Sequence, residues 1–115
     1  MGYEVYIGGK RLCTAGEART FIERLRGLMF RRRLGEEEGL LIKFASCWAC
    51  SIHTFFMRFP IDLVFLDGAG RVVDLKTLRP WRLYTPRQGC ASVLEILAGR
   101  AEAMGIEVGE VLEFR

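Results

Sequence analysis

The sequence has 115 residues, half of them apolar, and a net charge of +3. A chain of this length is expected to form a single domain over residues 1–115, and its core needs no disulfide or metal. The mild charge gives no reason to expect nucleic acid or an anionic membrane as a partner, and no segment approaches the roughly 20 apolar residues of a membrane span. The first residues lack the pattern of a signal peptide, so we expect a cytoplasmic protein.

The composition is unusual in its amides and basic residues. There is no Asn and one Gln, and fourteen Arg stand against three Lys. Depletion of thermolabile amides is typical of proteins from hot environments. We therefore expect a thermophilic source.

The chain begins with a hairpin pattern. Alternating apolar residues over 3–7 lead into Gly8-Gly9, and a second short run follows over 10–14. A Gly-Gly pair between two such runs is typical of a tight hairpin turn.

An amphipathic helix is predicted over residues 15–28. Thr14 stands three residues before Glu17, which is the spacing of a capping box. The apolar residues that follow recur at helical spacing; they are Ala18, Phe21, Ile22, Leu25, Leu28 and Met29. This apolar stripe indicates contact with the core. The charges that follow, Arg31–Arg33 and Glu36–Glu38, indicate a solvated turn.

The rest of the chain is predicted to be mostly strand. The predicted strands are Leu40–Phe44, Ile61–Leu66, Arg71–Leu75, Val93–Leu97 and Val111–Phe114. Asp67 to Gly70 joins two of them as a hairpin, and Gly99 to Met104 forms a short helical turn. Short strands with Gly-rich turns predict a mainly β fold, a sandwich or barrel with one main helix and a short second one.

Four cysteines raise three alternatives. Cys47 and Cys50 form a C-x-x-C with His53 three residues later, which offers three ligands for zinc, with Cys13 or Cys90 as a fourth. A redox pair would need a helix after the C-x-x-C, and the residues that follow look extended. Buried thiols or structural disulfides are the third alternative, and four cysteines allow three pairings.

Polar residues lie within an aromatic stretch over residues 53–62. Asp62 alternates with Val64 and Leu66, and Glu95 alternates with Val93 and Leu97, so both carboxylates are directed at a core. A buried carboxylate costs several kcal/mol unless it is paired. An internal ion-pair network that holds the strands in register is one interpretation. The other is a ligand pocket with a polar floor and aromatic walls.

Motifs of familiar enzymes are missing from the sequence. It contains no G-x-S-x-G, no phosphate-binding loop, no H-E-x-x-H and no dinucleotide fingerprint, and we expect no cofactor. Nucleic-acid binding would need a basic face with exposed aromatic residues, and the aromatic residues here look buried in strands.

The order and spacing of five blocks resemble one known family. The blocks are Glu23–Met29, Gly39–Leu41, Ser51–Asp62, Arg79–Arg82 and Val93–Gly99. Together they resemble the domain-of-unknown-function family 192, which is widespread in bacteria and archaea, over about residues 14–114. The resemblance implies a compact jelly-roll-like β-sandwich or barrel, and it implies no established activity.

The leading hypothesis is a small binding domain for a polar or anionic small-molecule ligand, as a monomer or homodimer. The expected ligand-binding residues are His53, Phe55, Met57, Arg58, Asp62, Trp81, Arg82 and Glu95. A second hypothesis is a hydrolase-type enzyme that uses His53 and Asp62 as acid and base. A third is a structural domain with a Cys/His metal site.

Overall fold

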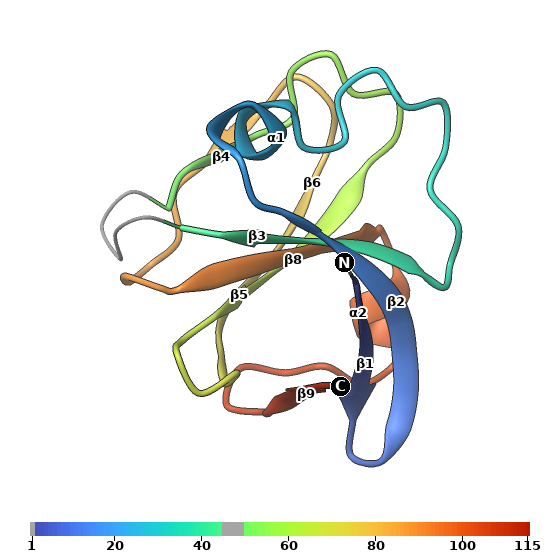
Figure 1. Cartoon of the computed structure of the whole chain (residues 1–115), viewed down its shortest axis with the longest axis vertical. Helices are drawn as coiled ribbons and strands as arrows, with labels where there is room; N and C mark the ends of the chain where they lie inside the picture. The colour runs from blue at the N-terminus through green and yellow to red at the C-terminus, as the bar shows by residue number, and fades with distance from the viewer. Residues whose placement is uncertain (1, 45–49) are drawn as a thin grey trace.

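The computed structural model describes residues 2–44 and 50–115, without the side chains of Phe21, Ile22 and Leu25, and it is built mainly of strands (Figure 1). The strands are β1 (Gly2–Ile7), β2 (Lys10–Ala18), β3 (Glu38–Lys43), β4 (Ile52–His53), β5 (Ile61–Leu66), β6 (Val72–Leu78), β7 (Leu83–Tyr84), β8 (Ser92–Leu97) and β9 (Leu112–Phe114). The helices are α1 (Phe21–Arg26) and α2 (Arg100–Ala103). The prediction of a mainly β fold is confirmed.

Seven strands form one sheet in the order β6-β5-β8-β3-β2-β1-β9, while β4 and β7 pair separately. The sheet curls into a half-barrel. At one end of the sheet its two edge strands, β6 and β9, approach each other. There Val72 donates its N–H to the carbonyl oxygen of Glu110 (2.8 Å), and Arg71 forms an isolated β-bridge with Val111. At the other end lie α1 and the loops around it (Figure 1).

The first hairpin forms as predicted. β1 and β2 pair antiparallel around Gly8 and Gly9. These glycines have φ of +54° and +80°. Two successive residues with positive φ suit the right-handed twist of the flanking strands, and glycine adopts this backbone without a steric penalty.

The long predicted helix over 15–28 is wrong at its start. Residues up to Ala18 extend β2, which pairs in parallel with β3, and α1 covers only Phe21–Arg26. The capping box belongs to Thr20 and Glu23: Thr20 Oγ1 accepts from the Glu23 N–H, and Glu23 Oε1 accepts from the Thr20 N–H, both at 3.0 Å. The same Thr-x-x-Glu spacing occurs six residues earlier, where pairing with β3 takes the backbone instead. Neither helix in the described ranges is long and apolar enough to cross a membrane.

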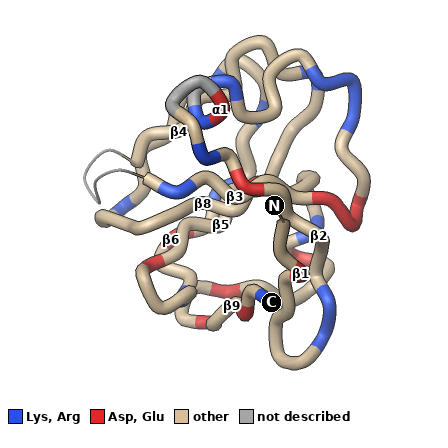
Figure 2. The backbone as a smooth tube through the Cα atoms, viewed as in Figure 1, with Lys and Arg blue, Asp and Glu red and all other residues tan. Residues whose placement is uncertain are grey.

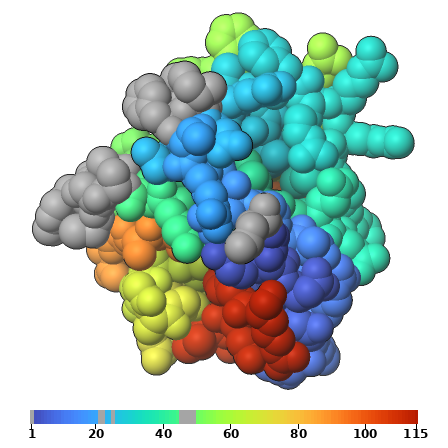
Figure 3. Space-filling view, viewed as in Figure 1, coloured from blue at the N-terminus to red at the C-terminus, as the bar shows by residue number. Residues whose placement is uncertain are grey.

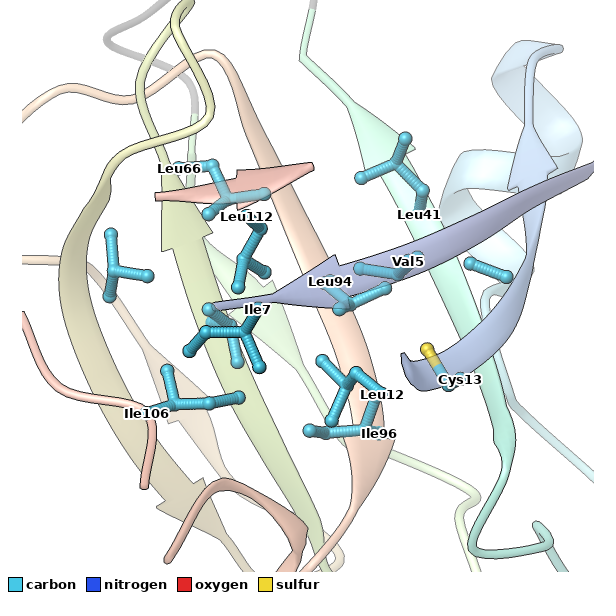
Figure 4. Packing of buried hydrophobic residues seen from close by; sticks show 13 residues of the cluster. Val5, Ile7, Leu12, Cys13, Leu41, Leu66, Leu94, Ile96, Ile106 and Leu112 are labelled. Carbon is cyan, nitrogen blue, oxygen red and sulfur yellow. The ribbon is translucent and has the colours of Figure 1, made fainter. Parts of the chain in front are cut away.

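Each face of the sheet packs against its own core. Figure 4 shows one of them, in which Leu94 and Ile96 of β8 lie beside Val5 and Leu12. Val93, on the same strand, belongs to the other core, together with Leu63 and Phe65. Because successive residues of a strand point to opposite faces, β8 is buried on both sides.

Candidate functional site

Glu95 is a carboxyl group buried in the middle of the sheet. It lies on β8, where it pairs with Leu40 of β3 and Leu63 of β5, and only 3% of it is exposed. No described residue forms a hydrogen bond with its Oε1. Since buried polar atoms are nearly always paired, this oxygen needs an explanation beyond packing.

A cavity of about 110 Å³ lies against Glu95. Its wall is formed by the end of α1 and the turn that follows, together with β4 and the loop after it. The lining residues are Arg24, Arg26, Gly27, Leu28, Met29, Ile42, Ser51, Ile52, His53, Met57 and Glu95. Gly27 leaves room above the carboxyl, because a Cβ at this position would lie 3.6 Å from Glu95 Oε1.

Burial raises the pKa of Glu95 to about 8, because removal from water penalises the charged form. The carboxyl is therefore mostly protonated at neutral pH. A protonated carboxyl offers one O–H donor besides its acceptor oxygens, and it does not repel an anion.

The loop after β4 is a tight turn over Thr54–Met57. Met57 donates its N–H to the Thr54 carbonyl oxygen at 3.3 Å, and Phe56, the third residue of the turn, has φ of +62°. Type II turns have this geometry and usually place glycine at the third position. Phe56 is held outward with 48% of it exposed, whereas Met57 turns inward to the cavity.

A second turn, over Arg79–Arg82, has the same pattern. Pro80 fills its second position and Trp81 its third, with φ of +64°. The buried hydroxyl of Thr54 bridges the two ends of this turn: it donates to the Arg79 carbonyl oxygen at 2.6 Å and accepts from the Arg82 N–H at 2.9 Å. Two further bonds join Thr54 to the backbone of Trp81 and Arg82. Thr54 thus fixes the two turns against each other.

These turns and the segment after α1 present a row of rings, which we call the aromatic surface. It consists of His53, Phe55, Trp81, Phe56 and Phe30, in order of contact. Neighbouring ring centroids lie between 4.7 and 6.0 Å apart. The Phe30 N–H donates to the Phe56 carbonyl oxygen at 3.0 Å, which joins the third segment to the other two.

The aromatic surface coincides with the strained backbone of the protein. Among the described residues other than glycine, positive φ occurs at Phe30, Phe56 and Trp81, and each of these is about half exposed. A side chain in this conformation costs about 1 kcal/mol, and bulky residues adopt it rarely. Because the three rings are half exposed, burial of their apolar surface contributes little free energy to offset this cost. Strain of this kind clusters at binding and catalytic sites.

The expectation that these aromatic residues are buried in strands is therefore wrong. β4 ends at His53, and the residues over 54–60 form turns instead of a strand. Phe55 and Trp81 lie at the surface, 38% and 54% exposed. The argument against a nucleic-acid partner rested in part on their burial, and this part of the argument no longer holds.

Asp62 lies apart from the other predicted site residues. It is on β5 opposite Ile96, and it faces a different cavity of about 350 Å³ beside α2. Its carboxylate accepts from Thr77 Oγ1 (2.6 Å) and from the N–H groups of Gly99 and Ala101 (both 3.0 Å). The structure does not bring the predicted acid–base pair of His53 and Asp62 together, because the two side chains line different cavities.

The remaining predicted residues gather at the α1 end. His53, Met57 and Glu95 line one cavity, and Phe55 and Trp81 form part of the aromatic surface above it. Arg58, the residue after the first turn, and Arg82, the last residue of the second, are exposed. The salt-bridge network expected for Asp62 and Glu95 does not form within the described part of the chain, since neither carboxylate has an Arg or Lys partner there.

Three contributors to the site were missed in the sequence. Thr54, Gly27 and Phe30 have no chemistry that marks them as functional, and they matter here through turns and close approaches. Pro80 was an available signal, because proline favours the second position of a type II turn and so places Trp81 at the exposed third position.

The cysteines give no metal cluster within residues 2–44 and 50–115, where no three potential ligands lie together. Cys47 lies outside the described residues. Cys50 donates from Sγ to the Cys90 carbonyl oxygen at 3.2 Å. Cys13 is buried in the other core, and burial raises its pKa to about 11, which disfavours a reactive thiolate.

Comparison with solved structures supports the fold. A crystal structure of a protein from Sinorhizobium meliloti 1021 has a TM-score of 0.90 at 24% identity, and the match covers 99% of this chain and 94% of that one. A protein of unknown function from Novosphingobium aromaticivorans has a TM-score of 0.80 at 26% identity, with 97% and 83% covered.

Sequence relatives come from thermophilic archaea, as expected from the amide-poor composition. UPF0127 proteins are 37% identical in Thermococcus gammatolerans and 36% identical in Pyrococcus horikoshii. The matches cover 84% and 91% of this chain, and 63% and 93% of those proteins. This chain therefore spans less than two thirds of the Thermococcus relative. A family model matches residues 4–114, which confirms the resemblance: the chain belongs to the family described as "Uncharacterized ACR", domain of unknown function 192.

Proposed function

We propose that this domain binds a polar, anionic ligand. Most of the ligand would lie on the aromatic surface, and one small polar group would enter the cavity beside Glu95. The observation that carries the proposal is the buried Glu95 Oε1, which faces this cavity without a partner among the described residues. Leaving a buried polar atom unpaired costs about 1–3 kcal/mol. A bound ligand that hydrogen-bonds to it would offset this cost.

The electrostatics of the cavity favour an anion. Arg24 and Arg26 contribute to its wall, and Glu95 is mostly uncharged at neutral pH. His53 and the protonated Glu95 supply hydrogen-bonding groups at its base. A volume of about 110 Å³ admits only a few atoms, so the greater part of a ligand would rest on the rings outside.

The proposal is tested by NMR titration of the ¹⁵N-labelled protein with three anionic probes: a thymidine dinucleotide, tetragalacturonic acid and tetraglutamate. At millimolar concentration, at least one probe should shift the amide resonances of Gly27, His53 and Met57. Glu95→Gln keeps a neutral hydrogen-bonding group and should preserve binding, whereas Glu95→Leu should weaken it at least tenfold.

Asp62→Asn is the matched control, because it changes a buried carboxylate on the opposite face and should leave the affinity unchanged. The proposal fails if none of the three probes shifts the cavity amides, or if Glu95→Leu binds as tightly as the wild type.

A further inference from the structure

Positive charge is concentrated in the segments near the aromatic surface, and the small net charge of the whole chain does not show this. Segments 24–35, 51–60 and 79–85, which surround the aromatic surface, contain eight arginines and no Asp or Glu. The net charge of +3 therefore divides into +8 on these segments and −5 on the rest of the chain. In Figure 2, Lys and Arg follow the loops at the α1 end, although α1 itself carries an acidic residue, and acidic residues lie around β9 at the opposite end, where β2 and the C-terminus also carry basic residues.

The three basic segments lie together in space. Backbone hydrogen bonds join Phe30 to Phe56 and Thr54 to Trp81, as described above. Figure 3 shows the loop after α1 (cyan) and the loop after β4 (yellow-green) forming one end of the molecule. One surface thus combines half-exposed rings with arginines: Arg82 follows Trp81 directly in the sequence, and Arg58 lies two residues after Phe56.

We infer that this surface binds single-stranded nucleic acid. This inference rests on the proposed function, because it uses the same rings and names the ligand class. Unpaired bases stack on the faces of aromatic side chains, and arginines neutralise the phosphates between them. The adjoining cavity gives room for a polar group at the edge of a base, next to Glu95 and His53.

Two other occupants fit the surface less well. A second copy of the chain would bring two strongly positive surfaces together, and like charges in an interface cost several kcal/mol. An anionic membrane would satisfy the arginines, but its headgroups contain no planar rings that could stack on the exposed aromatic side chains.

The test is fluorescence anisotropy with four labelled probes: dT and U dodecamers, an abasic DNA dodecamer, and a heparin oligosaccharide as a polyanion without bases. Co-sedimentation with phosphatidylserine vesicles tests the membrane. The wild type should bind dT or U at least tenfold more tightly than the abasic strand. The relative affinities of dT and U distinguish DNA from RNA.

Variants separate stacking from charge. Trp81→Ala should weaken dT binding about tenfold and leave the abasic affinity unchanged, since stacking of one base contributes about 1–3 kcal/mol. Arg58→Gln with Arg82→Gln should lower the slope of log affinity against log salt by about 0.7 for each lost phosphate contact. Val108→Ala and Lys10→Gln, which remove an exposed apolar group and an exposed charge away from the aromatic surface, are the matched controls and should change neither quantity.

The possible outcomes are distinguishable. Equal binding of dT, abasic DNA and heparin, unaffected by Trp81→Ala, overturns base stacking. Binding to vesicles alone, binding to none of the probes, or dimerisation that Trp81→Ala abolishes overturns the inference as well. If tetragalacturonic acid or tetraglutamate shifts the cavity amides while oligonucleotides do not bind, the proposed function stands and the inference fails.

Discussion

Asp62 and Glu95 lie on opposite faces of one sheet, although their positions differ by a single step in the β5–β8 pairing: Leu63, and not Asp62, lies opposite Glu95. One carboxylate is fully hydrogen-bonded beside α2, and the other is buried without a described partner on Oε1. The environments of these two acids predict different responses to mutation and to pH.

Glu95 should make the protein less stable as the pH rises. Its pKa is about 8 in the folded state and near the ordinary glutamate value of 4.5 when unfolded, so between these values only the folded state keeps the proton. Unfolding then becomes easier by about 1 kcal/mol per pH unit from pH 5 to pH 8, and the effect levels off above pH 8. Urea unfolding at a series of pH values measures this slope.

Glu95→Gln supplies the comparison for this slope, since its amide does not titrate. The variant should lose most of the pH dependence over the same range, while every other titrating group is unchanged. Identical slopes in the two proteins would show that Glu95 is ionised in the folded state.

Asp62→Ala should destabilise the protein by about 3 kcal/mol. It removes the acceptor of the Gly99 and Ala101 N–H groups at the start of α2 and the partner of Thr77 Oγ1. Chemical denaturation measures the loss. Glu36→Ala, at an exposed position, provides the comparison for removing an acidic residue and should cost clearly less.

Thr54→Val should destabilise the two turns. Valine keeps the shape of threonine but leaves the Arg79 carbonyl oxygen and the Arg82 N–H without their common partner. We expect a loss of about 1–3 kcal/mol in the free energy of unfolding. Thr54→Ser retains the hydroxyl and should recover most of it; if serine and valine are equally destabilising, the hydroxyl bridge is unimportant.

The strained backbone at Trp81 predicts an unusual order of two substitutions. Trp81→Gly and Trp81→Ala both remove the ring, but only alanine keeps a Cβ at a φ of +64°. Glycine should therefore be the more stable variant by about 1 kcal/mol. At Phe55, whose φ is not positive, alanine should be more stable than glycine because it has less entropy to lose on folding. Thermal unfolding of the four variants gives both orders.

Much of the fold followed from local patterns. The Gly8-Gly9 turn and the strand Ile61–Leu66 were found where they form, because each depends on nearby residues alone. The helix was extended too far because two Thr-x-x-Glu pairs compete, and long-range pairing of β2 with β3 decides between them.

The site was predictable only in part. Alternation correctly grouped Asp62 with Val64 and Leu66, and Glu95 with Val93. Which groups share a face depends on the register between β5 and β8, and a shift of one residue moves every side chain to the other face. The local sequence does not contain that register.

The pairing of β1 with β9 has a consequence for how the chain folds. Glu4 and Arg115 exchange both backbone hydrogen bonds, at 3.0 and 2.9 Å, so residues more than a hundred positions apart are neighbours in the sheet. During synthesis, β1 therefore leaves the ribosome long before its partner β9 has been made. Formation of so many distant pairings is slow, so refolding should take milliseconds to seconds.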